Sequence, residues 1–116
     1  MCIRDSVYAP KVNGAQALHS LYRCVPLAVF KLYSSTAGLM GSLGQSPHGA
    51  ACAWLDSLAG FRASAAQPAV SVNWGFVAQI GYAARHGADA RAEASGLGAV
   101  RLSSTCLLYT SDAADE

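Results

Sequence analysis

The stretch FKLYSSTAGLMGSLGQSPHGAACAWLDSLAGFRASAAQPAVSVNWG, residues 30–75, decides the fold of this 116-residue chain. Residues 27–33 form a short apolar run rich in strand-forming side chains, and residues 70–74 alternate in polarity. Between them, residues 48–65 carry apolar side chains at helical spacing: Ala51, Trp54, Leu55, Leu58 and Phe61. A strand, a helix and a second strand in this order predict parallel pairing through a crossover.

The sequence on either side extends this α/β pattern. Pro10 suits a first helical turn, and apolar side chains spaced three to four apart predict a helix over residues 10–23. Residues 83–100 are rich in Ala, Gly and Arg, and we expect a short exposed helix over residues 88–95. The glycines of residues 38–44 predict a loop. Their spacing suggests a phosphate cradle, but the segment lacks both the G-x-G-x-x-G pattern and a P-loop lysine. The whole pattern favours an α/β fold with a parallel sheet.

The two ends of the chain look like translated DNA adapter rather than protein. Residues 1–6, MCIRDS, can be encoded by DNA whose reverse complement, read in another frame, encodes CLLYT, the peptide at residues 106–110. Such segments are set aside in reasoning about a fold. We therefore expect residues 1–6 and 106–116 to be adapter-derived and residues 7–105 to be an internal piece of a longer gene. The alternative is coincidence.

Charge and hydropathy narrow the class of partner. The chain carries a formal net charge of +1, and residues 7–105, with seven basic and three acidic side chains, carry +4. The basic residues form no cluster, which argues against a nucleic-acid partner. The apolar run at residues 24–30 is far shorter than the roughly 20 residues that span a bilayer, and there is no secretory signal. We expect a cytoplasmic protein with no nucleic-acid and no membrane partner.

The cysteines and histidines do not predict a metal or disulfide framework. Cys2 and Cys106 fall in the expected adapter segments, which leaves Cys24 and Cys52. These two form no C-x-x-C pair, and the histidines are scattered: His19, His48 and His86. We therefore expect no disulfide framework and no zinc site.

Residues 30–75 resemble the second half of the ketoreductase domain of modular polyketide synthases. Upstream, KVNGAQALH at residues 11–19 is similar to the family's K-V-x-G-A-x-x-L-H helix. The resemblance implies the C-terminal half of a doubly wound, Rossmann-like parallel sheet of the short-chain dehydrogenase/reductase superfamily. It also implies NADPH as cofactor, a β-ketoacyl chain on an acyl carrier protein as substrate, and other domains of a multidomain synthase as partners. The Gly-rich turn that binds the nucleotide would lie upstream of this chain, so we expect the chain alone to be inactive.

The resemblance also assigns site residues. Ketoreductases of this family use a Lys, a Ser, a Tyr and an Asn. The lysine falls on Lys11, and the serine falls on Ser35, the second serine of YSS. The tyrosine of the family's G-Q-x-x-Y-A-A-A-N motif falls on His48 and its asparagine on Cys52, so both are replaced.

A second motif implies where the cofactor lies. Trp74 and Gly75 resemble the family's W-G turn beside the nicotinamide, with ordinary strand-end packing of the tryptophan as the alternative. The following residues, 76–82, look like the family's lid. Phe76 replaces the proline that commonly follows W-G, which changes the expected geometry of the lid.

The chemistry of ketone reduction makes the replacement at His48 important. Hydride delivery leaves an alkoxide, so the site must donate a proton and hydrogen-bond the developing charge; a hydroxyl such as Ser35 suits the second task. An imidazolium is a competent acid, but its Nε2 lies roughly 2 Å nearer its own Cα than a phenol oxygen does, and the Lys11 cation would lower its pKa. A misplacement of about 1 Å can cost on the order of a hundredfold in rate. We expect a slow or inactive reductase, with a catalytically silent, structural ketoreductase-like domain as the alternative.

Cys52 follows His48 by four residues, so both lie on one helical face. Three interpretations arise: a Cys–His nucleophilic dyad, half of a metal site, or a small buried residue in the former asparagine position. A dyad usually draws its partners from separate elements and a metal needs further ligands, so the third is favoured. For the whole chain, a stand-alone short-chain reductase is a further alternative.

Overall fold

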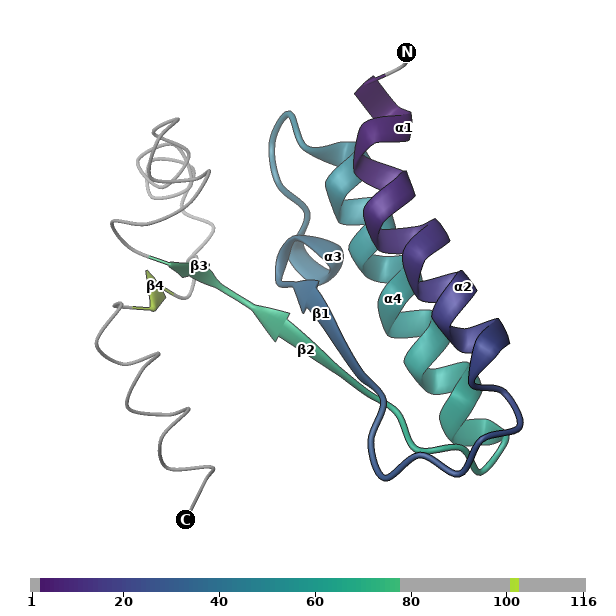
Figure 1. The fold of residues 1–116 in the computed structure, drawn as a ribbon. Helices are drawn as coiled ribbons and strands as arrows, with labels where there is room; N and C mark the ends of the chain where they lie inside the picture. The colour runs from purple at the N-terminus through teal and green to yellow at the C-terminus, as the bar shows by residue number, and fades with distance from the viewer. Residues whose placement is uncertain (1–2, 78–100, 103–116) are drawn as a thin grey trace. The chain divides into compact units, whose positions relative to one another are not determined.

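The computed structural model describes residues 3–77 and 101–102 of the chain. The chain divides into two compact units, residues 1–74 and residues 75–116. The first unit holds three helices in one continuous run, two strands and two further helices (Figure 1): α1 (Ile3–Tyr8), η1 (Ala9–Asn13), α2 (Gly14–Leu21), β1 (Lys31–Ser35), α3 (Ala37–Met40), α4 (Ser46–Ser64) and β2 (Val70–Trp74).

The two strands of the first unit pair in parallel, as the sequence predicts. Lys31 is the partner of Val70 at one end of the ladder, and Ser35 is the partner of Trp74 at the other. Helix α4 connects the strands, which is the crossover that parallel pairing requires. The carboxyl ends of both strands therefore lie at the same end of the sheet.

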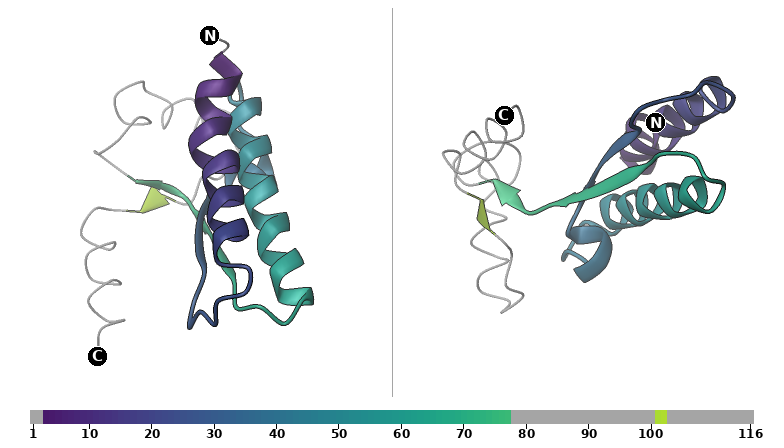
Figure 2. Two further views of the ribbon diagram at one scale, coloured as in Figure 1. Left: turned by 45° about the vertical axis from the view of Figure 1, so that its right-hand side comes forward. Right: turned by 90° about the horizontal axis from the view of Figure 1, so that it is seen from below.

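Helices and sheet share one core. The α1–η1–α2 run lies beside α4 (Figures 1 and 2). Along β1 the side chains of Leu32 and Ser34 are buried while those of Lys31 and Tyr33 are exposed, the period-two alternation of a strand with one covered face. The buried apolar side chains form one cluster: Ala15, Phe30, Leu32, Leu55, Leu58 and Ala59.

The first helix begins earlier than the sequence predicts, because Pro10 lies inside a helical run rather than at its start. Helix α1 begins at Ile3, and the chain stays helical to Leu21. A proline has no N–H to complete the bond to the residue four positions earlier. The chain accommodates it as a π-helix over Ala9–Asn13, in which the Gly14 N–H reaches back to the carbonyl oxygen of Ala9.

The first strand lies further along the chain than predicted: residues 31–35 instead of 27–33. Its partner strand sets these limits. Val70 N–H donates to the carbonyl oxygen of Phe30 at 2.9 Å, and the preceding Pro68 has no N–H with which to extend the ladder. At the other end β2 continues to Trp74, so the polar residue Ser35 is paired as well.

The region between β1 and α4 also differs from a plain loop. Helix α3 occupies Ala37–Met40, and only then come the turns at Gly41 and Gly44, whose φ angles of +75° and +72° favour glycine. Helix α4 begins at Ser46, two residues before the predicted start, with Pro47 in its first turn. Strand β2 has the predicted bounds.

Arg62 is the largest fully buried side chain of the described residues, at 1% exposure. Its Nη1 lies 2.9 Å from Nδ1 of His19 on α2, and its guanidinium lies over the Phe30 ring, 4.1 Å from the ring centre. His19 is also buried. Arg62 thereby joins the two long helices to the start of β1.

In the second unit, β3 (Phe76–Val77) pairs in parallel with β4 (Arg101–Leu102). The predicted helix over residues 88–95, most of the predicted lid, and His86 lie outside the described residues. Within residues 3–77 and 101–102, no helix is both long enough and apolar enough to cross a bilayer.

Candidate active site

The carboxyl ends of β1 and β2 are where parallel α/β sheets place their ligand sites. Ser35 ends β1 and Trp74 ends β2. Helix α4 contributes His48 from its first turn and Cys52 from its second, and the π turn contributes Lys11. The fold thus places the predicted residues of the first unit on four neighbouring elements.

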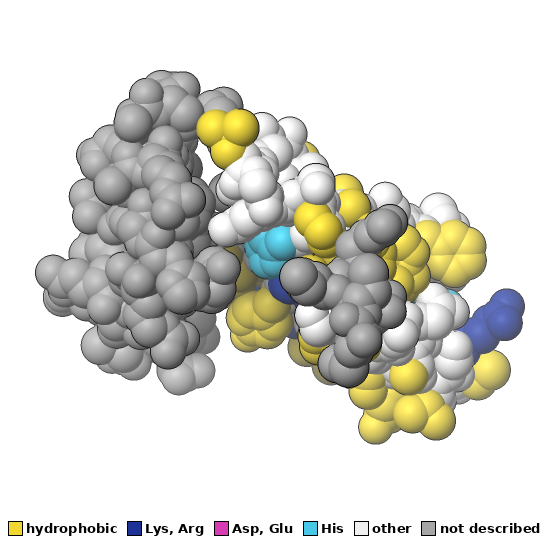
Figure 3. All heavy atoms as spheres, turned by 90° about the horizontal axis from the view of Figure 1, so that it is seen from above, with side chains coloured by type: hydrophobic (Ala, Val, Ile, Leu, Met, Phe, Trp, Pro, Cys, Tyr) yellow, Lys and Arg dark blue, Asp and Glu magenta, His cyan; other side chains and the backbone are white. Residues whose placement is uncertain are grey.

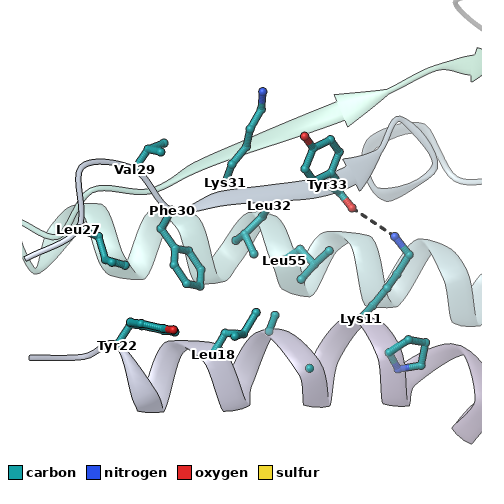
Figure 4. Close-up of a pocket in the computed structure, with 13 residues that line it drawn as sticks. Lys11, Leu18, Tyr22, Leu27, Val29, Phe30, Lys31, Leu32, Tyr33 and Leu55 are labelled. Carbon is teal, nitrogen blue, oxygen red and sulfur yellow. Dashed lines mark hydrogen bonds between the residues drawn. The ribbon is translucent and has the colours of Figure 1, made fainter. Parts of the chain in front are cut away.

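Lys11 reaches from the helical run to the edge of the sheet. Its Nζ donates to the carbonyl oxygen of Tyr33 at 3.3 Å, two residues before Ser35 (Figure 4). The same side chain lines one end of a cavity of about 590 Å³ between α2 and β1, whose other lining residues are mostly apolar. The lysine is therefore anchored to the strand that carries Ser35.

Ser35 accepts a hydrogen bond that leaves its own proton available. The Ala37 N–H donates to Ser35 Oγ at 3.2 Å, where the chain turns into α3. An oxygen that accepts from a backbone N–H can still donate its O–H to another acceptor. The half-buried hydroxyl is suited to donate to an oxygen that is gaining negative charge.

His48 and Cys52 contact each other. Nε2 of His48 lies 3.7 Å from Sγ of Cys52. Burial of the half-buried imidazole lowers the pKa of His48 below its ordinary value, and the positive charge of Lys11 lowers it further. At neutral pH the imidazole is therefore predominantly neutral.

Cys52 itself is 0% exposed, and it packs against α3. A nucleophilic cysteine needs access and an activating environment, so its burial agrees with the small buried residue and not with a dyad. Among the described residues, no three His, Cys, Asp or Glu side chains come together as a group that could hold a metal ion.

Trp74 stacks on Tyr33. Their ring centres are 6.0 Å apart and the ring planes differ by 2°. The Trp74 Nε1 is buried and has no hydrogen-bond partner in the described part of the chain, so a donor is left unused at the end of β2. Gly75, predicted beside Trp74 at the cofactor, begins the second unit.

A polar network that no sequence motif indicated joins helix α4 to both strands beside this site. Asp56 on α4 bonds to Ser71 and Asn73 on β2, and Asn73 reaches Ser34 on β1. Asp56 is the only acidic residue of α4 and follows Cys52 by four residues. A lone carboxylate on the helical face of the two predicted site residues was the signal available.

The surface beside the site is apolar. Leu39, Met40 and Leu43, which belong to α3 and the turn after it, are all exposed. Figure 3 shows the molecule from the end at which the chain begins in Figure 1. Among the described atoms visible in this view are apolar side chains, a histidine and basic side chains, and none is acidic.

A parallel strand–helix–strand unit with its polar side chains gathered at the carboxyl strand ends defines a Rossmann-like α/β protein. The chain belongs to the KR domain family, whose profile matches residues 4–79. This match confirms the resemblance to ketoreductase domains of polyketide synthases.

Curated relatives agree. The chain is 42% identical over 108 residues, 93% of its length, to the spectinabilin polyketide synthase system protein NorB of Streptomyces orinoci. It is 45% identical over 87 residues, 75% of its length, to the polyketide synthase GfsB of Streptomyces halstedii. These alignments cover 5% and 2% of the two relatives, so the chain corresponds to a small part of each.

Solved structures confirm the fold. An A1-type ketoreductase matches with a TM-score of 0.70 and 38% identity over 76% of this chain. The first ketoreductase of the tylosin polyketide synthase matches with a TM-score of 0.68 and 37% identity, again over 76% of this chain. The matched region is 18% and 20% of those chains, respectively.

Proposed function

We propose that this chain is a segment of a ketoreductase domain that uses NADPH to reduce a β-ketoacyl thioester, carried by an acyl carrier protein of a multidomain synthase, to the β-hydroxyacyl form. The observation that carries the proposal is the placement of Lys11, Ser35 and His48. The motif resemblance assigns them to the family's lysine, serine and tyrosine positions. In support, Lys11 is bonded to the strand that ends at Ser35 and its charge acts on His48.

Each residue has a distinct role in the proposed reaction. Ser35 donates its hydroxyl proton in a hydrogen bond to the keto oxygen and stabilises the negative charge that develops there. His48, in its protonated form, transfers a proton to that oxygen as the alcohol forms. Lys11 orients the cofactor and sets the protonation of His48.

The cofactor supplies the hydride when it is bound. The unpartnered Trp74 Nε1 is a buried donor that suits a carbonyl or amide oxygen of such a ligand. We therefore propose that Trp74 and Gly75 line the nicotinamide side of the site. The exposed apolar side chains beside α3 suit an acyl chain better than a charged ligand.

The proposed enzyme is slow. The neutral His48 is a poor proton donor at neutral pH, and an imidazole reaches less far than a phenol. The second candidate function, a structural ketoreductase-like domain without turnover, is favoured by the complete burial of Cys52 at the asparagine position.

The test compares the ketoreductase domain that contains this chain with its His48→Tyr variant and with the double variant His48→Tyr, Cys52→Asn. NADPH oxidation is followed with a β-ketoacyl thioester. We expect weak turnover by the unchanged domain and a rate about a hundredfold higher in the double variant. Turnover only after restoration establishes the silent domain instead. Absence of turnover in all three proteins refutes the ketoreductase proposal.

We also propose that residues 7–105 are the ketoreductase segment and that residues 1–6 and 106–116 are adapter-derived. Sequencing the source DNA from primers placed within residues 7–105 tests this. If the source DNA encodes other residues before residue 7 and after residue 105, the proposal is supported. If it encodes residues 1–6 and 106–116 as they stand, the proposal is refuted.

A further inference from the structure

We propose that Asp56 is a positioning residue of the candidate active site. Through Asn73 and Ser34, it holds the Ser35 end of β1 in place against helix α4. This inference rests on the proposed ketoreductase function and adds to it a group that does not touch the substrate.

The Asp56 carboxylate holds strand β2 with both of its oxygens. Ser71 Oγ donates to Oδ1 at 2.5 Å. The side-chain nitrogen of Asn73 donates to Oδ2 at 3.2 Å, in the amide orientation that places this nitrogen against acceptors. Ser71 and Asn73 are two residues apart in a strand and so point to the same face of the sheet. One carboxylate therefore binds two polar side chains of β2.

Asn73 carries the network across to β1. The same amide nitrogen lies 2.9 Å from Ser34 Oγ and 3.1 Å from the carbonyl oxygen of Ser35. The Ser34 hydroxyl in turn donates to the carbonyl oxygen of Cys52 at 3.1 Å. The network thus leaves α4 at Asp56, crosses both strands, and returns to α4 one helical turn earlier.

This closed path includes a neighbour of each group that must act together: Ser34 precedes Ser35 in β1, and the Cys52 side chain contacts His48. Ser35 is at the end of β1, and His48 is on α4, one turn before Cys52. A shift of the strand along the helix would change the separation of Ser35 and His48, although neither side chain contacts Asp56. Rates of enzyme reactions fall by on the order of a hundredfold for errors of about 1 Å in such separations.

An ionised carboxylate suits the position better than any neutral side chain. It accepts at both oxygens and donates at neither, which matches the two donors from β2. Hydrogen bonds to a charged acceptor are also shorter and stronger than neutral ones. Asparagine, of nearly the same shape, would set its own N–H₂ group against one of these donors.

The test uses Asp56→Asn in the ketoreductase domain that contains this chain, with Ser57→Ala as the matched control. Ser57 is the next residue on α4; it is exposed, and its hydroxyl donates to Ala53 within the same helix. Kinetics are measured in the His48→Tyr, Cys52→Asn background. We expect Asp56→Asn to lower kcat by about 10- to 100-fold, with an unchanged KM for NADPH and only a small fall in melting temperature from the weakened hydrogen bonds. Ser57→Ala should change none of these.

A second readout does not depend on turnover. In the domain that retains Cys52, its alkylation under native conditions is followed by peptide mass spectrometry. Because Ser34 ties Cys52 to the network, we expect Asp56→Asn to speed alkylation of this buried thiol about tenfold through local opening, and Ser57→Ala to leave it unchanged.

Each outcome decides the inference. Equal kcat and equal alkylation in Asp56→Asn and Ser57→Ala overturn it, and so does a loss of kcat that comes with a matching loss of NADPH binding and a large fall in melting temperature. If the restored domain is inactive before Asp56 is changed, the proposed function fails, and the alkylation rate alone decides whether Asp56 positions the strand.

Discussion

His48 is the residue that we propose as the proton donor in place of the family's tyrosine. Its imidazole is half-buried, contacts Cys52 and lies within the field of Lys11. Burial and the lysine charge both favour the neutral ring. At any given pH, the group at the proposed proton-donor position is therefore protonated to a smaller extent than an ordinary histidine.

The first prediction concerns the pH dependence of turnover. Because the pKa of His48 is lowered, the protonated donor becomes more abundant as the pH falls through and below 6.5. We expect kcat/KM of the ketoreductase domain to rise on acidification from pH 8 to pH 5. His48→Tyr should remove this rise. A flat profile with His48 in place would rule out the imidazolium as proton donor.

The second prediction concerns stability and follows from the same lowered pKa. The unfolded chain protonates His48 near 6.5, whereas the folded chain protonates it only at lower pH. Between the lowered pKa of the folded chain and 6.5, the unfolded state binds more protons than the folded state. The free energy of unfolding therefore rises with pH in this range, and the contribution of neutral His48 is lost as the pH falls below 6.5. Urea denaturation at pH 5 and pH 7 should show a smaller loss in His48→Gln than in the unchanged domain. An equal loss in both would contradict the assignment.

At the scale of elements, helix α4 organises the first unit through two different contacts. Near its start it packs closely on α3, where a Cβ added to Gly38 would lie 3.0 Å from the backbone nitrogen of Ala53. Near its end, the buried Arg62 joins it to His19 on α2 and to Phe30. The two ends of the helix can be tested separately.

The third prediction compares two glycines. Gly38→Ala places a methyl group 3.0 Å from the backbone nitrogen of Ala53 and 3.1 Å from Cβ of Cys52, so α3 and α4 must shift apart slightly. We expect a loss of about 1–3 kcal/mol in the free energy of unfolding. Gly60, inside α4, has nothing within 4 Å of an added Cβ, and Gly60→Ala should stabilise by about 0.5–1 kcal/mol. Melting temperatures should therefore change in opposite directions. A change of the same sign in both would show that α3 does not pack on α4 as described.

The fourth prediction concerns Arg62 and His19. Arg62→Met removes a buried cation–π contact and leaves the His19 ring nitrogen without its partner, which should cost about 2–4 kcal/mol. Adding His19→Leu removes the stranded polar group, and we expect the double variant to lose less stability than the sum of the single variants. Arg23→Leu, at an exposed arginine, serves as the control. Additive losses in urea denaturation would mean that the two side chains are not coupled.

At the scale of the whole molecule, the helices of the first unit cover one face of the β1–β2 sheet. Helices pack against the side of β1 that carries Leu32, while Tyr33 on the other side remains 59% exposed. Parallel sheets in proteins of known structure are covered on both faces. A two-stranded parallel sheet covered on one face buries too little apolar surface to be strongly stable.

The fifth prediction follows for the 116-residue chain expressed by itself. We expect limited proteolysis to degrade it within the time in which an intact ketoreductase domain resists, and we expect no NADPH binding by fluorescence titration. A compact protease-resistant core would contradict the first expectation, and tight NADPH binding would contradict the second.

Much of the fold was predictable because it depends on local pattern. The helical spacing around Leu55 and the alternation at residues 70–74 predicted α4 and β2 closely. The bounds of β1 were wrong, because they are set by which residues of β2 are available to pair. The predicted start of the first helix at Pro10 was also wrong. A proline is typical of a helix start, and only the helical turns on both sides show that Pro10 lies inside a π-helix.

By itself, the sequence determined the class of fold and the family, and it supplied the proposed assignment of four motif positions, because these depend on residue order and spacing. Only the tertiary structure decided how those positions behave. It buries Cys52, turns the His48 ring toward the thiol, bonds Lys11 to the edge of β1, and joins Asp56 to the strand that ends at Ser35. Such properties depend on desolvation, on charge at short distance and on hydrogen bonds between residues far apart in the chain, and none of these is set by local sequence.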